Sequence, residues 1–313
     1  MNEQSTYDVA IIGGGPAGYT AGIYAARASL NAAVFEQGMP GGQIATSDTI
    51  DNYPAIPSIS GAELGAKLQE HSEEAGASTI YEMVNIVHID QMGEFDVITE
   101  ANTYHARSLI VATGARPRLA GFIGETEYRG RGISYCATCD GMFYRGKEIF
   151  VVGGGNSAVE EAMFLAKIAD RVTMVVRKDH FRASRGMVSR LLKHDNVSVL
   201  FNTSIKEVSG STLLNRIEFV DTENGNSSIV EKPEGSFGIF VFTGNDPVVD
   251  IVRDFVDLGQ DGGVITDESM MTRTPGLFCV GDMRSKQLRQ VITAAADGAI
   301  AGNAAYRYLE HMG

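Results

Sequence analysis

Short apolar runs, each ended by glycines or by charged residues, alternate along this chain with alanine-rich stretches of helical spacing. The first run, Val9 to Ile12, ends in three glycines; an alanine-rich stretch and a second apolar run, Ala32 to Phe35, follow. This order predicts a strand, a tight turn, a helix and a second strand. No run reaches the roughly 18 apolar residues of a membrane-spanning helix, so we expect no membrane segment.

The glycines of the first turn have the spacing G-x-G-x-x-G, at Gly13, Gly15 and Gly18. The first permits a tight turn, the second lets the backbone approach a pyrophosphate, and the third lets helix and strand pack closely. The N–H groups at the start of the helix would face the phosphates. Glu36 ends the second strand, where a carboxylate can accept a hydrogen bond from a ribose hydroxyl. The segment therefore predicts a dinucleotide site rather than a structural glycine turn.

The same unit recurs 140 residues later (153 − 13 = 140), in the run KEIFVVGGGNSAVEEAMFLAKIADRVTMVVRKDHFR. Gly153, Gly155 and Ala158 occupy the three small-residue positions, and alanine is an accepted variant at the third. Two dinucleotide folds in one chain indicate two dinucleotides, most naturally a tightly held flavin and an exchangeable nicotinamide.

The second unit lacks the ribose-binding acid, because the counterpart of Glu36 is Val176. Positively charged residues follow directly, at Arg177, Lys178 and Arg182. Cations at this point favour a 2′-phosphate, and hence NADP over NAD, while the alternative is a solvated basic strand end.

Most of the chain between and after the two units predicts short strands, at 78–90, 94–102, 108–115, 197–210, 214–225 and 236–244. Two joints rich in glycine and proline, 112–118 and 242–247, bracket the second unit. We therefore expect an α/β protein with two Rossmann-like dinucleotide-binding domains, each a three-layer ββα arrangement, one inserted into the other. Residues 1–116 and 246–313 would form the FAD-binding domain, and 117–245 the NADPH-binding domain.

The C-terminal part predicts a turn, a short strand, the pair Gly281-Asp282, and a long alanine-rich helix from about Arg289. Gly298 and Gly302 weaken this helix in isolation, so packing must stabilise it. Its N-terminus could direct a partial positive charge at a flavin.

A net charge of −13 argues against general electrostatic binding to nucleic acid. The N-terminal segment lacks the basic start and apolar stretch of a signal peptide. Three cysteines in 313 residues do not make a disulfide framework, so we expect a reducing cytoplasm.

Two of the three cysteines lie in CATCD, residues 136 to 140. Structural zinc needs four ligands, and there is no second C-x-x-C. A loop this short gains little chain entropy from a structural bridge. A redox pair remains, because C-x-x-C cysteines at a helix start have lowered thiol pKa values and exchange readily. Asp140 can carry the proton of this exchange, or it can simply cap a helix. Cys279, inside an apolar strand, is interpreted as a small buried hydrophobe.

The segments GGGPAGYTAGIYAARA, GGQ, ATGA, CATCDG, GGGNSAVEEA and a GD plus RQ pair occur in this order along nearly the whole chain. In this it resembles the low-molecular-weight bacterial thioredoxin reductases that use FAD and NADPH. The resemblance implies a homodimeric flavoprotein that passes electrons from NADPH to FAD, to a Cys136–Cys139 disulfide, and to thioredoxin or a thioredoxin-like protein. It also implies domains that rotate against each other, with a hinge at the two joints.

The resemblance further implies a role for individual residues. Cys139 would be the cysteine nearer the flavin, Cys136 its partner, and Asp140 the acid-base group. The FAD-binding residues would be Gly13, Gly15, Pro16, Ala17, Gly18, Glu36, Gln37, Gly41, Gly42, Gln43, Asn52, Ala112, Thr113, Gly114, Gly281, Asp282, Arg289, Gln290 and Val291. The NADPH-binding residues would be Gly153, Gly155, Asn156, Ser157, Ala158, Arg177, Lys178 and Arg182.

Two departures from the family pattern bear on these expectations. The phosphate-reading pattern H-R-R-x-x-x-R is VRKDHFR here, so Val176 replaces the histidine and Lys178 the second arginine. Lysine keeps the charge but loses bidentate geometry, so we expect specificity for NADPH to be retained in a weakened form. The family has two aromatic residues after CATCDG, and the resemblance implies that these positions form part of the thioredoxin contact. Here they are Met142 and Phe143, so one of the two aromatic side chains is replaced by methionine.

Other functions stay open at this point. Related flavoproteins take electrons from ferredoxin or a deazaflavin, but they lack the nucleotide motif GGGNSA that this chain keeps. Reductases of peroxide defence, with another disulfide partner, usually carry a further N-terminal region, whereas this chain starts at the FAD strand. A flavin-binding redox sensor is the non-enzymatic alternative. The sequence does not decide which cysteine attacks the partner.

Overall fold

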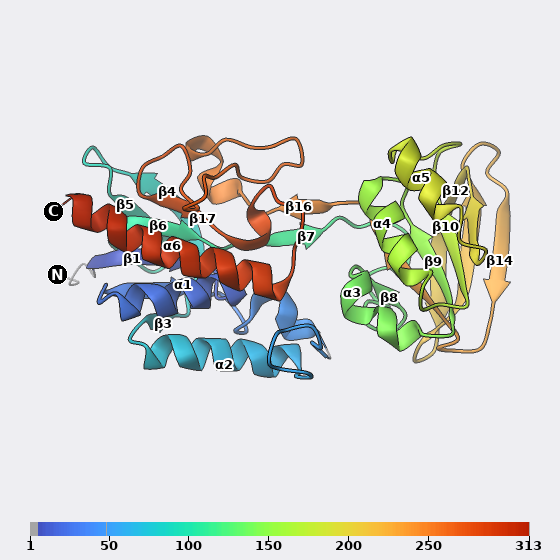
Figure 1. Cartoon of the computed structure of the whole chain (residues 1–313), viewed down its shortest axis with the longest axis horizontal. Helices are drawn as coiled ribbons and strands as arrows, with labels where there is room; N and C mark the ends of the chain where they lie inside the picture. Colours follow the sequence, from blue (N-terminus) through green and yellow to red (C-terminus); the bar gives the residue numbers. More distant parts are fainter. Residues whose placement is uncertain (1–5, 48, 313) are drawn as a thin grey trace. The chain divides into compact units, whose positions relative to one another are not determined.

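The computed structural model describes residues 6–47 and 49–312. The chain divides into two compact units, one formed by residues 1–116 and 246–313 (unit 1) and one by residues 117–245 (unit 2). The chain passes between the units through two short strands, β7 (Ala115–Pro117) and β16 (Asn245–Pro247), which pair with each other (Figure 1).

Unit 1 is built on one mixed sheet. Strands β3, β2, β1 and β6 run parallel in that order, β17 adds parallel to β6, and β5 and β4 continue antiparallel. The strands are β1 (Thr6–Ile12), β2 (Ala32–Phe35), β3 (Ser78–Ile80), β4 (Val84–Ile89), β5 (Phe95–Thr99), β6 (Thr103–Val111) and β17 (Leu277–Cys279). The helices are α1 (Pro16–Arg27), α2 (Gly61–Glu74) and α6 (Val291–Met312), with 3₁₀ turns η1 (Gly42–Thr46), η3 (Asp250–Phe255) and η4 (Gly281–Met283).

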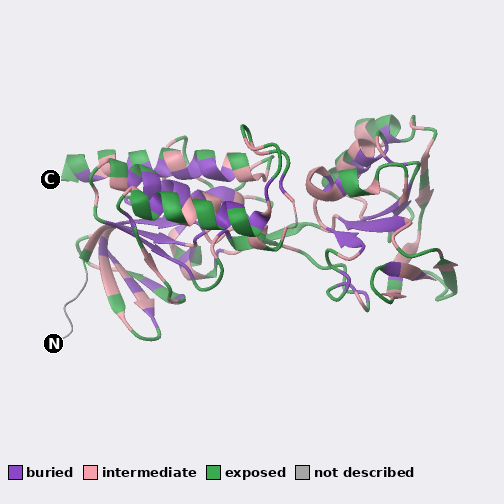
Figure 2. Cartoon of the chain, turned by 90° about the horizontal axis from the view of Figure 1, so that it is seen from below, coloured by how far each residue is buried: buried purple, intermediate pink, exposed green. Residues whose placement is uncertain are grey.

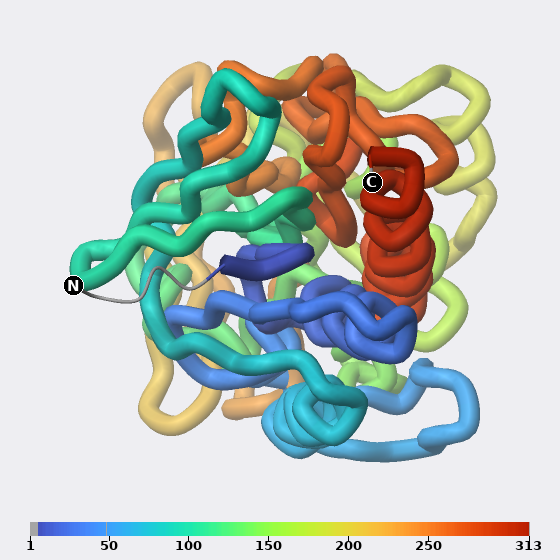
Figure 3. The backbone as a smooth tube through the Cα atoms, turned by 90° about the vertical axis from the view of Figure 1, so that its left-hand side faces the viewer, coloured from blue at the N-terminus to red at the C-terminus, as the bar shows by residue number. Residues whose placement is uncertain are grey.

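Helices α1 and α6, from opposite ends of the chain, lie side by side against this sheet (Figures 1 and 3). Glycine makes the approach possible: a methyl group on Gly298 would lie 2.1 Å from the Ala17 carbonyl oxygen, and one on Gly302 2.7 Å from the Ala21 oxygen. The expectation that tertiary packing stabilises the C-terminal helix is therefore confirmed. The helix begins at Val291, two residues later than expected.

Unit 2 repeats the arrangement on a parallel sheet of order β11-β10-β9-β15-β8. Its strands are β8 (Ile133–Ser134), β9 (Glu148–Val152), β10 (Arg171–Val175), β11 (Val197–Leu200) and β15 (Phe237–Val241). Helices α4 (Asn156–Leu165) and α5 (Arg185–Leu191) lie on one face (Figure 1). An antiparallel sheet of β12 (Thr203–Gly210), β13 (Leu214–Asp221) and β14 (Ser227–Glu231) covers the other. The short α3 (Ala137–Asp140) and η2 (Gly141–Tyr144) precede β9.

Each unit therefore has a buried central sheet with one apolar core on each face (Figure 2). The sequence repeat is a structural repeat: β1 pairs with β2 through Ile12 and Phe35, and β9 pairs with β10 through Val152 and Val175, both displaced by 140 residues. The expected α/β fold with two Rossmann-like units is confirmed.

Two predicted strands are wrong in detail, because each is two strands. Segment 78–90 breaks into β3 and β4, and segment 197–210 into β11 and β12. At the second break Asn202 takes a left-handed φ of 49°, where the chain passes from one sheet of unit 2 to the other. Helices α2 and α5 were not predicted, although Ser60 and Glu63 carry a signal for the first: the Ser60 hydroxyl caps α2 by accepting a hydrogen bond from Glu63 N.

Candidate active site

In unit 1 several segments meet at the turn between β1 and α1. Gly41 N donates to the Gly14 oxygen at 2.8 Å, and a methyl group on Gly13 would lie 2.5 Å from the Ala112 oxygen. A methyl group on Gly281 would come within 3.1 Å of Ala17 Cβ. The structure thus gathers four predicted flavin segments, which are far apart in sequence, around the N-terminus of α1. Of the predicted residues, Pro16 and Ala17 begin this helix and Gly18 packs on the Gly13 oxygen.

Glu36 is buried directly after β2, with both carboxylate oxygens hydrogen-bonded to backbone. One accepts from Gly14 N at 2.7 Å and the other from Gly38 N at 2.8 Å. Glu36 therefore lies beside the glycine turn, as the sequence predicted. The carboxylate also fixes the backbone of that turn, and Gln37 lies exposed beside it.

Several of the other predicted flavin residues make side-chain hydrogen bonds within unit 1. Gln43 Nε2 donates to the Ala115 oxygen beside Gly114, Thr113 Oγ1 donates to the Val248 oxygen at 2.6 Å, and Asn52 Nδ2 donates to Gln290 Oε1 at 3.0 Å. Gly42 opens η1 behind the left-handed Gly41, and Val291 opens α6. We call these residues, together with Gly281, Asp282 and Arg289, the rim of the predicted flavin site. Hydrogen bonds within unit 1 hold its side chains.

Among the described residues of the rim, Asp282 has a buried side-chain atom without a hydrogen-bond partner. Its Oδ1 has no hydrogen-bond partner among the described residues. Burial raises the pKa of its carboxyl, opposed by the nearby Lys286 and Arg289. Arg289 itself donates from Nε to the Asp282 backbone oxygen at 3.2 Å. A buried acceptor without a partner is costly, and a hydroxyl of a bound dinucleotide would satisfy it. The residues present therefore fit a dinucleotide.

In unit 2 the glycine turn after β9 is backed by the segment that carries the basic residues. Arg182 N and Ala183 N both donate to the Gly154 oxygen, at 2.8 and 3.1 Å, and Ser184 N donates to Asn156 Oδ1 at 3.0 Å. Ser157 is exposed beside Asn156 in the first turn of α4, and Ala158 is buried. The three predicted cations, Arg177, Lys178 and Arg182, are exposed.

Val176 occupies the position that Glu36 has in unit 1. It is buried, and a methyl group on Gly154 would lie 3.0 Å from its Cγ1. An apolar side chain therefore stands where the first unit has a carboxylate. The side chains of Arg177 and Arg182 make no hydrogen bond or ion pair with the described residues, so they can meet an anionic ligand.

The two cysteines of CATCD form a disulfide at the start of α3. Cys136 is the N-cap residue, and its Sγ accepts from Cys139 N at 3.2 Å; the S–S distance is 2.07 Å. Both cysteines are half-buried. The placement at a helix start is the one expected for exchange-competent cysteines, because backbone N–H groups there stabilise a thiolate.

Asp140 ends α3 and faces the segment before the disulfide. Its Oδ2 accepts from the Ser134 hydroxyl at 2.6 Å, and Ser134 Oγ accepts in turn from Cys136 N at 3.1 Å. Burial, and after it the negative charge of Asp140, raises the pKa of Tyr144 to about 12. The carboxylate makes no capping hydrogen bond to η2, so the capping alternative for Asp140 is wrong. Ser134, which no sequence signal singled out, joins the carboxylate to the disulfide backbone.

Apolar side chains are exposed directly after the disulfide. Met142 is 44% and Phe143 53% exposed. Arg145 and Lys147 follow, with Arg145 Nη2 at 3.7 Å from Met142 Sδ and Lys147 Nζ 5.6 Å from the Tyr144 ring centroid. Met142 and Phe143 thus form a small exposed apolar surface close to the cysteines in sequence, bordered by the positive charges of Arg145 and Lys147.

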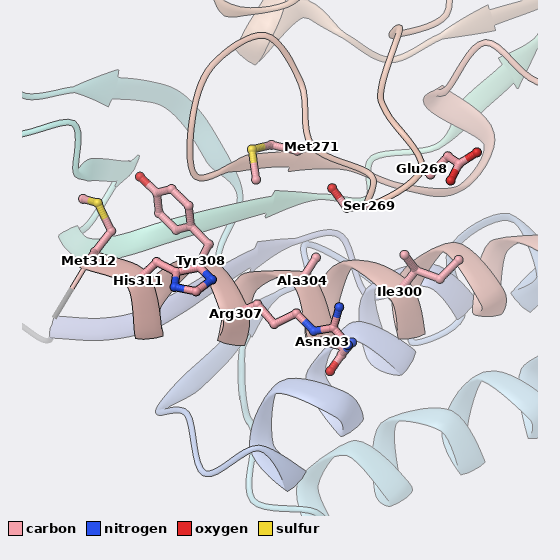
Figure 4. A pocket seen from close by; sticks show the side chains of 10 residues that line it. All are labelled: Glu268, Ser269, Met271, Ile300, Asn303, Ala304, Arg307, Tyr308, His311 and Met312. Carbon is pink, nitrogen blue, oxygen red and sulfur yellow. The ribbon is translucent and has the colours of Figure 1, made fainter.

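Three further observations concern the chain as a whole. Cys279 is fully buried in β17, as expected, and burial raises the pKa of its thiol. No helix among residues 6–47 and 49–312 is both long and apolar enough to cross a membrane. An open pocket of about 530 Å³ lies between α6 and the turn after residue 267 (Figure 4), and none of the residues with a predicted role lines it.

Comparison with known proteins agrees with this architecture. A family model described as pyridine nucleotide-disulphide oxidoreductase matches residues 7–298. A thioredoxin reductase of Peptoclostridium litorale is 43% identical over 313 residues, covering 99% of each chain. One of Bacillus subtilis (strain 168) is 39% identical, covering all of this chain and 98% of the relative.

Solved structures give the same result. The crystal structure of thioredoxin reductase from Streptococcus pyogenes MGAS5005 superposes with a TM-score of 0.90 at 41% identity, over 99% of this chain and 100% of that one. With two glycine turns, a half-buried disulfide and these relatives, the chain belongs to the pyridine nucleotide-disulphide oxidoreductase family.

Proposed function

We propose that this chain is a thioredoxin–disulfide reductase that uses NADPH as electron donor and FAD as a bound cofactor. The observation that carries the proposal is the Cys136–Cys139 disulfide at a helix start, in a chain that also has two dinucleotide turns. The relatives named thioredoxin reductase, about 40% identical over the whole chain, support it.

The residues around the α1 turn would hold FAD, and those around the α4 turn would hold NADPH. When bound, FAD would supply the two electrons that disulfide reduction needs, with NADPH as their source. Glu36, Gln43 and Asp282 would orient the flavin nucleotide, while Arg177, Lys178 and Arg182 would bind the 2′-phosphate by charge-assisted hydrogen bonds.

The cysteines perform the exchange itself. In the reduced pair, a thiolate of one cysteine attacks the partner disulfide, forms a mixed disulfide and releases one partner thiolate. The second cysteine then attacks the mixed disulfide, restores Cys136–Cys139 and releases the second thiol. Asp140, held by Ser134, supplies and removes the protons of these steps. The exposed Met142 and Phe143 would form part of the thioredoxin contact.

The cysteines lie in unit 2 and the flavin residues in unit 1, so turnover requires the two units to meet. We place the hinge of this motion at the β7–β16 ribbon. We also propose that the protein is a cytoplasmic homodimer, which sedimentation and cell fractionation would test.

The test of the function uses the purified yellow protein with NADPH and a thioredoxin. We expect thioredoxin-dependent oxidation of NADPH in the wild type and its loss in Cys136→Ser and Cys139→Ser, with FAD still bound in both. Cys279→Ala is the matched control and is expected to keep activity, because this cysteine is buried in a strand. Absence of thioredoxin-dependent turnover in the wild type would reject the function, and loss of flavin from the cysteine variants would reject the catalytic role of the pair.

The electron donor needs its own experiment. The flavin is titrated anaerobically with NADPH and, separately, with reduced ferredoxin. We expect NADPH to bleach the flavin absorbance. A flavin that responds only to ferredoxin would leave the dithiol chemistry standing and replace the donor.

A further inference from the structure

A buried cluster of charges in unit 1 has no role in the function proposed above. Asp297, on the inner side of α6, lies between two cations: Oδ1 is 3.0 Å from Arg284 Nη1, and Oδ2 is 2.8 Å from Lys286 Nζ. Only 9%, 15% and 12% of the side chains of Asp297, Arg284 and Lys286 are exposed. Buried ion pairs add little net stability, because the cost of desolvating the charges offsets their attraction.

The cluster is joined directly to the flavin rim. Asp297 Oδ2 also accepts from Gly281 N at 3.0 Å, and Gly281 immediately precedes Asp282. Arg284 is held from the other side, with Nε donating to Thr266 Oγ1 at 2.8 Å. The segment from Gly281 to Lys286 is thus attached to α6 through one carboxylate.

The charges around Asp282 indicate that the Asp297 carboxylate prevents Lys286 from pairing with Asp282. Asp282 keeps a buried Oδ1 that has no partner in the described part of the chain, although Lys286 is close enough to favour its ionised form electrostatically. A buried ammonium group without a counter-ion is strongly unfavourable, so it pairs with a carboxylate within reach. As long as Asp297 binds Lys286 and Arg284, the Asp282 oxygen stays available for a ligand.

We infer that Asp297 is a positioning residue: it binds the Lys286 and Arg284 cations and thereby keeps the Asp282 carboxylate free for a hydroxyl group of the flavin nucleotide. This inference rests on the proposed flavin site. Removing the Asp297 charge would leave two buried cations beside Asp282. Lys286 would then pair with Asp282, and the cofactor would have to break that pair in order to bind.

The experiment measures FAD binding to flavin-depleted protein by quenching of flavin fluorescence. Asp297→Asn keeps the shape and an acceptor for Gly281 N but removes the charge. We expect the Kd for FAD to rise about tenfold or more, the size of a coupling of ~1.4 kcal/mol. In Asp297→Asn with Lys286→Met, the cation that would capture Asp282 is gone, and the Kd is expected to return to within about threefold of the wild type.

The matched control is Asp257→Asn, which breaks the exposed Asp257–Arg273 pair of the same unit and is expected to leave FAD binding unchanged. Thermal unfolding with and without FAD separates positioning from general stability. For a positioning residue the rise in Tm caused by FAD shrinks, because that rise follows the affinity. Equal loss of Tm in both states, an unchanged Kd in Asp297→Asn, or a double variant that neither folds nor binds would overturn the inference.

The flavin site is tested separately. Asp282→Asn is expected to weaken FAD binding by about tenfold, because a charge-assisted hydrogen bond becomes a neutral one. Unchanged binding in Asp282→Asn, or no FAD binding by the wild type, would contradict the proposed function itself rather than the role of Asp297.

Discussion

One side chain makes the two nucleotide turns chemically different. Glu36 holds the backbone of the first turn with its carboxylate, whereas Val176 covers the second with a methyl group near Gly154. A valine cannot accept a hydrogen bond from a ribose hydroxyl, so in the proposed function the second turn would recognise its nucleotide through groups further along the chain. Those groups are the exposed Arg177, Lys178 and Arg182.

We predict that Arg177→Ala raises the KM for NADPH about tenfold or more, because a hydrogen bond to a charged group contributes roughly 1.5–3 kcal/mol. The KM for NADH should change less than about twofold, since NADH lacks the phosphate. Steady-state kinetics with both nucleotides are the measurement. Arg171→Ala, an exposed arginine at the opposite end of β10, is the control, and equal effects of Arg177→Ala on both nucleotides would remove the phosphate assignment.

At the scale of elements, helix α6 depends on two glycines that weaken it. Gly298 and Gly302 lower the helix propensity but let the backbones of α6 and α1 approach closely, which completes one core of unit 1. This contact also positions the proposed flavin rim, because Gly281 N donates to Asp297 on α6.

We predict that Gly298→Ala destabilises the protein by about 1–3 kcal/mol, the usual cost of inserting a group into a full core. Gly186→Ala is a matched control in helix α5, where the added methyl group meets nothing within 4 Å. That substitution should stabilise by roughly 0.5–1 kcal/mol from helix propensity alone. Urea unfolding of the two variants gives the comparison, and destabilisation of similar size in both would contradict the packing argument.

Features determined by neighbouring residues could be predicted from the sequence, whereas features formed by packing of distant segments could not. The strands β1, β2, β9 and β10 were predictable because short apolar runs ended by glycines or by charged residues have few other structures. Strand β14 could not be predicted, since its residues are mostly exposed and no alternation marks it. The cluster of Asp297, Arg284 and Lys286 is formed by packing of α6 on a loop, and its only sequence signal is one acid in an alanine-rich helix.

At the scale of the whole molecule, the state of the three cysteines reports both on the redox site and on the core. Cys136 and Cys139 form a half-buried disulfide, while Cys279 is fully buried, with a pKa raised by burial that keeps it a thiol. The two kinds of cysteine should therefore respond to different treatments, reduction in one case and unfolding in the other.

We predict that a thiol reagent labels no cysteine in the oxidised native protein and two after reduction. In denaturant, one cysteine should react without a reductant and three with it. Mass spectrometry of the labelled protein counts the adducts. Labelling in the oxidised native state would show that Cys279 is accessible, and fewer than two adducts after reduction would contradict an exchange-competent pair.

The division of unit 1 between the two ends of the chain has a consequence for biosynthesis. Residues 117–245 are contiguous, so unit 2 has all its residues while residues 246–313 are still to be made. Until then β6 lacks its partner β17 and the apolar side of α1 lacks its cover α6. Unit 1 is thus completed only after all of unit 2 has been made, and until then the nascent chain exposes an unpaired strand edge at β6 that chaperones can protect, while unit 2 can already fold.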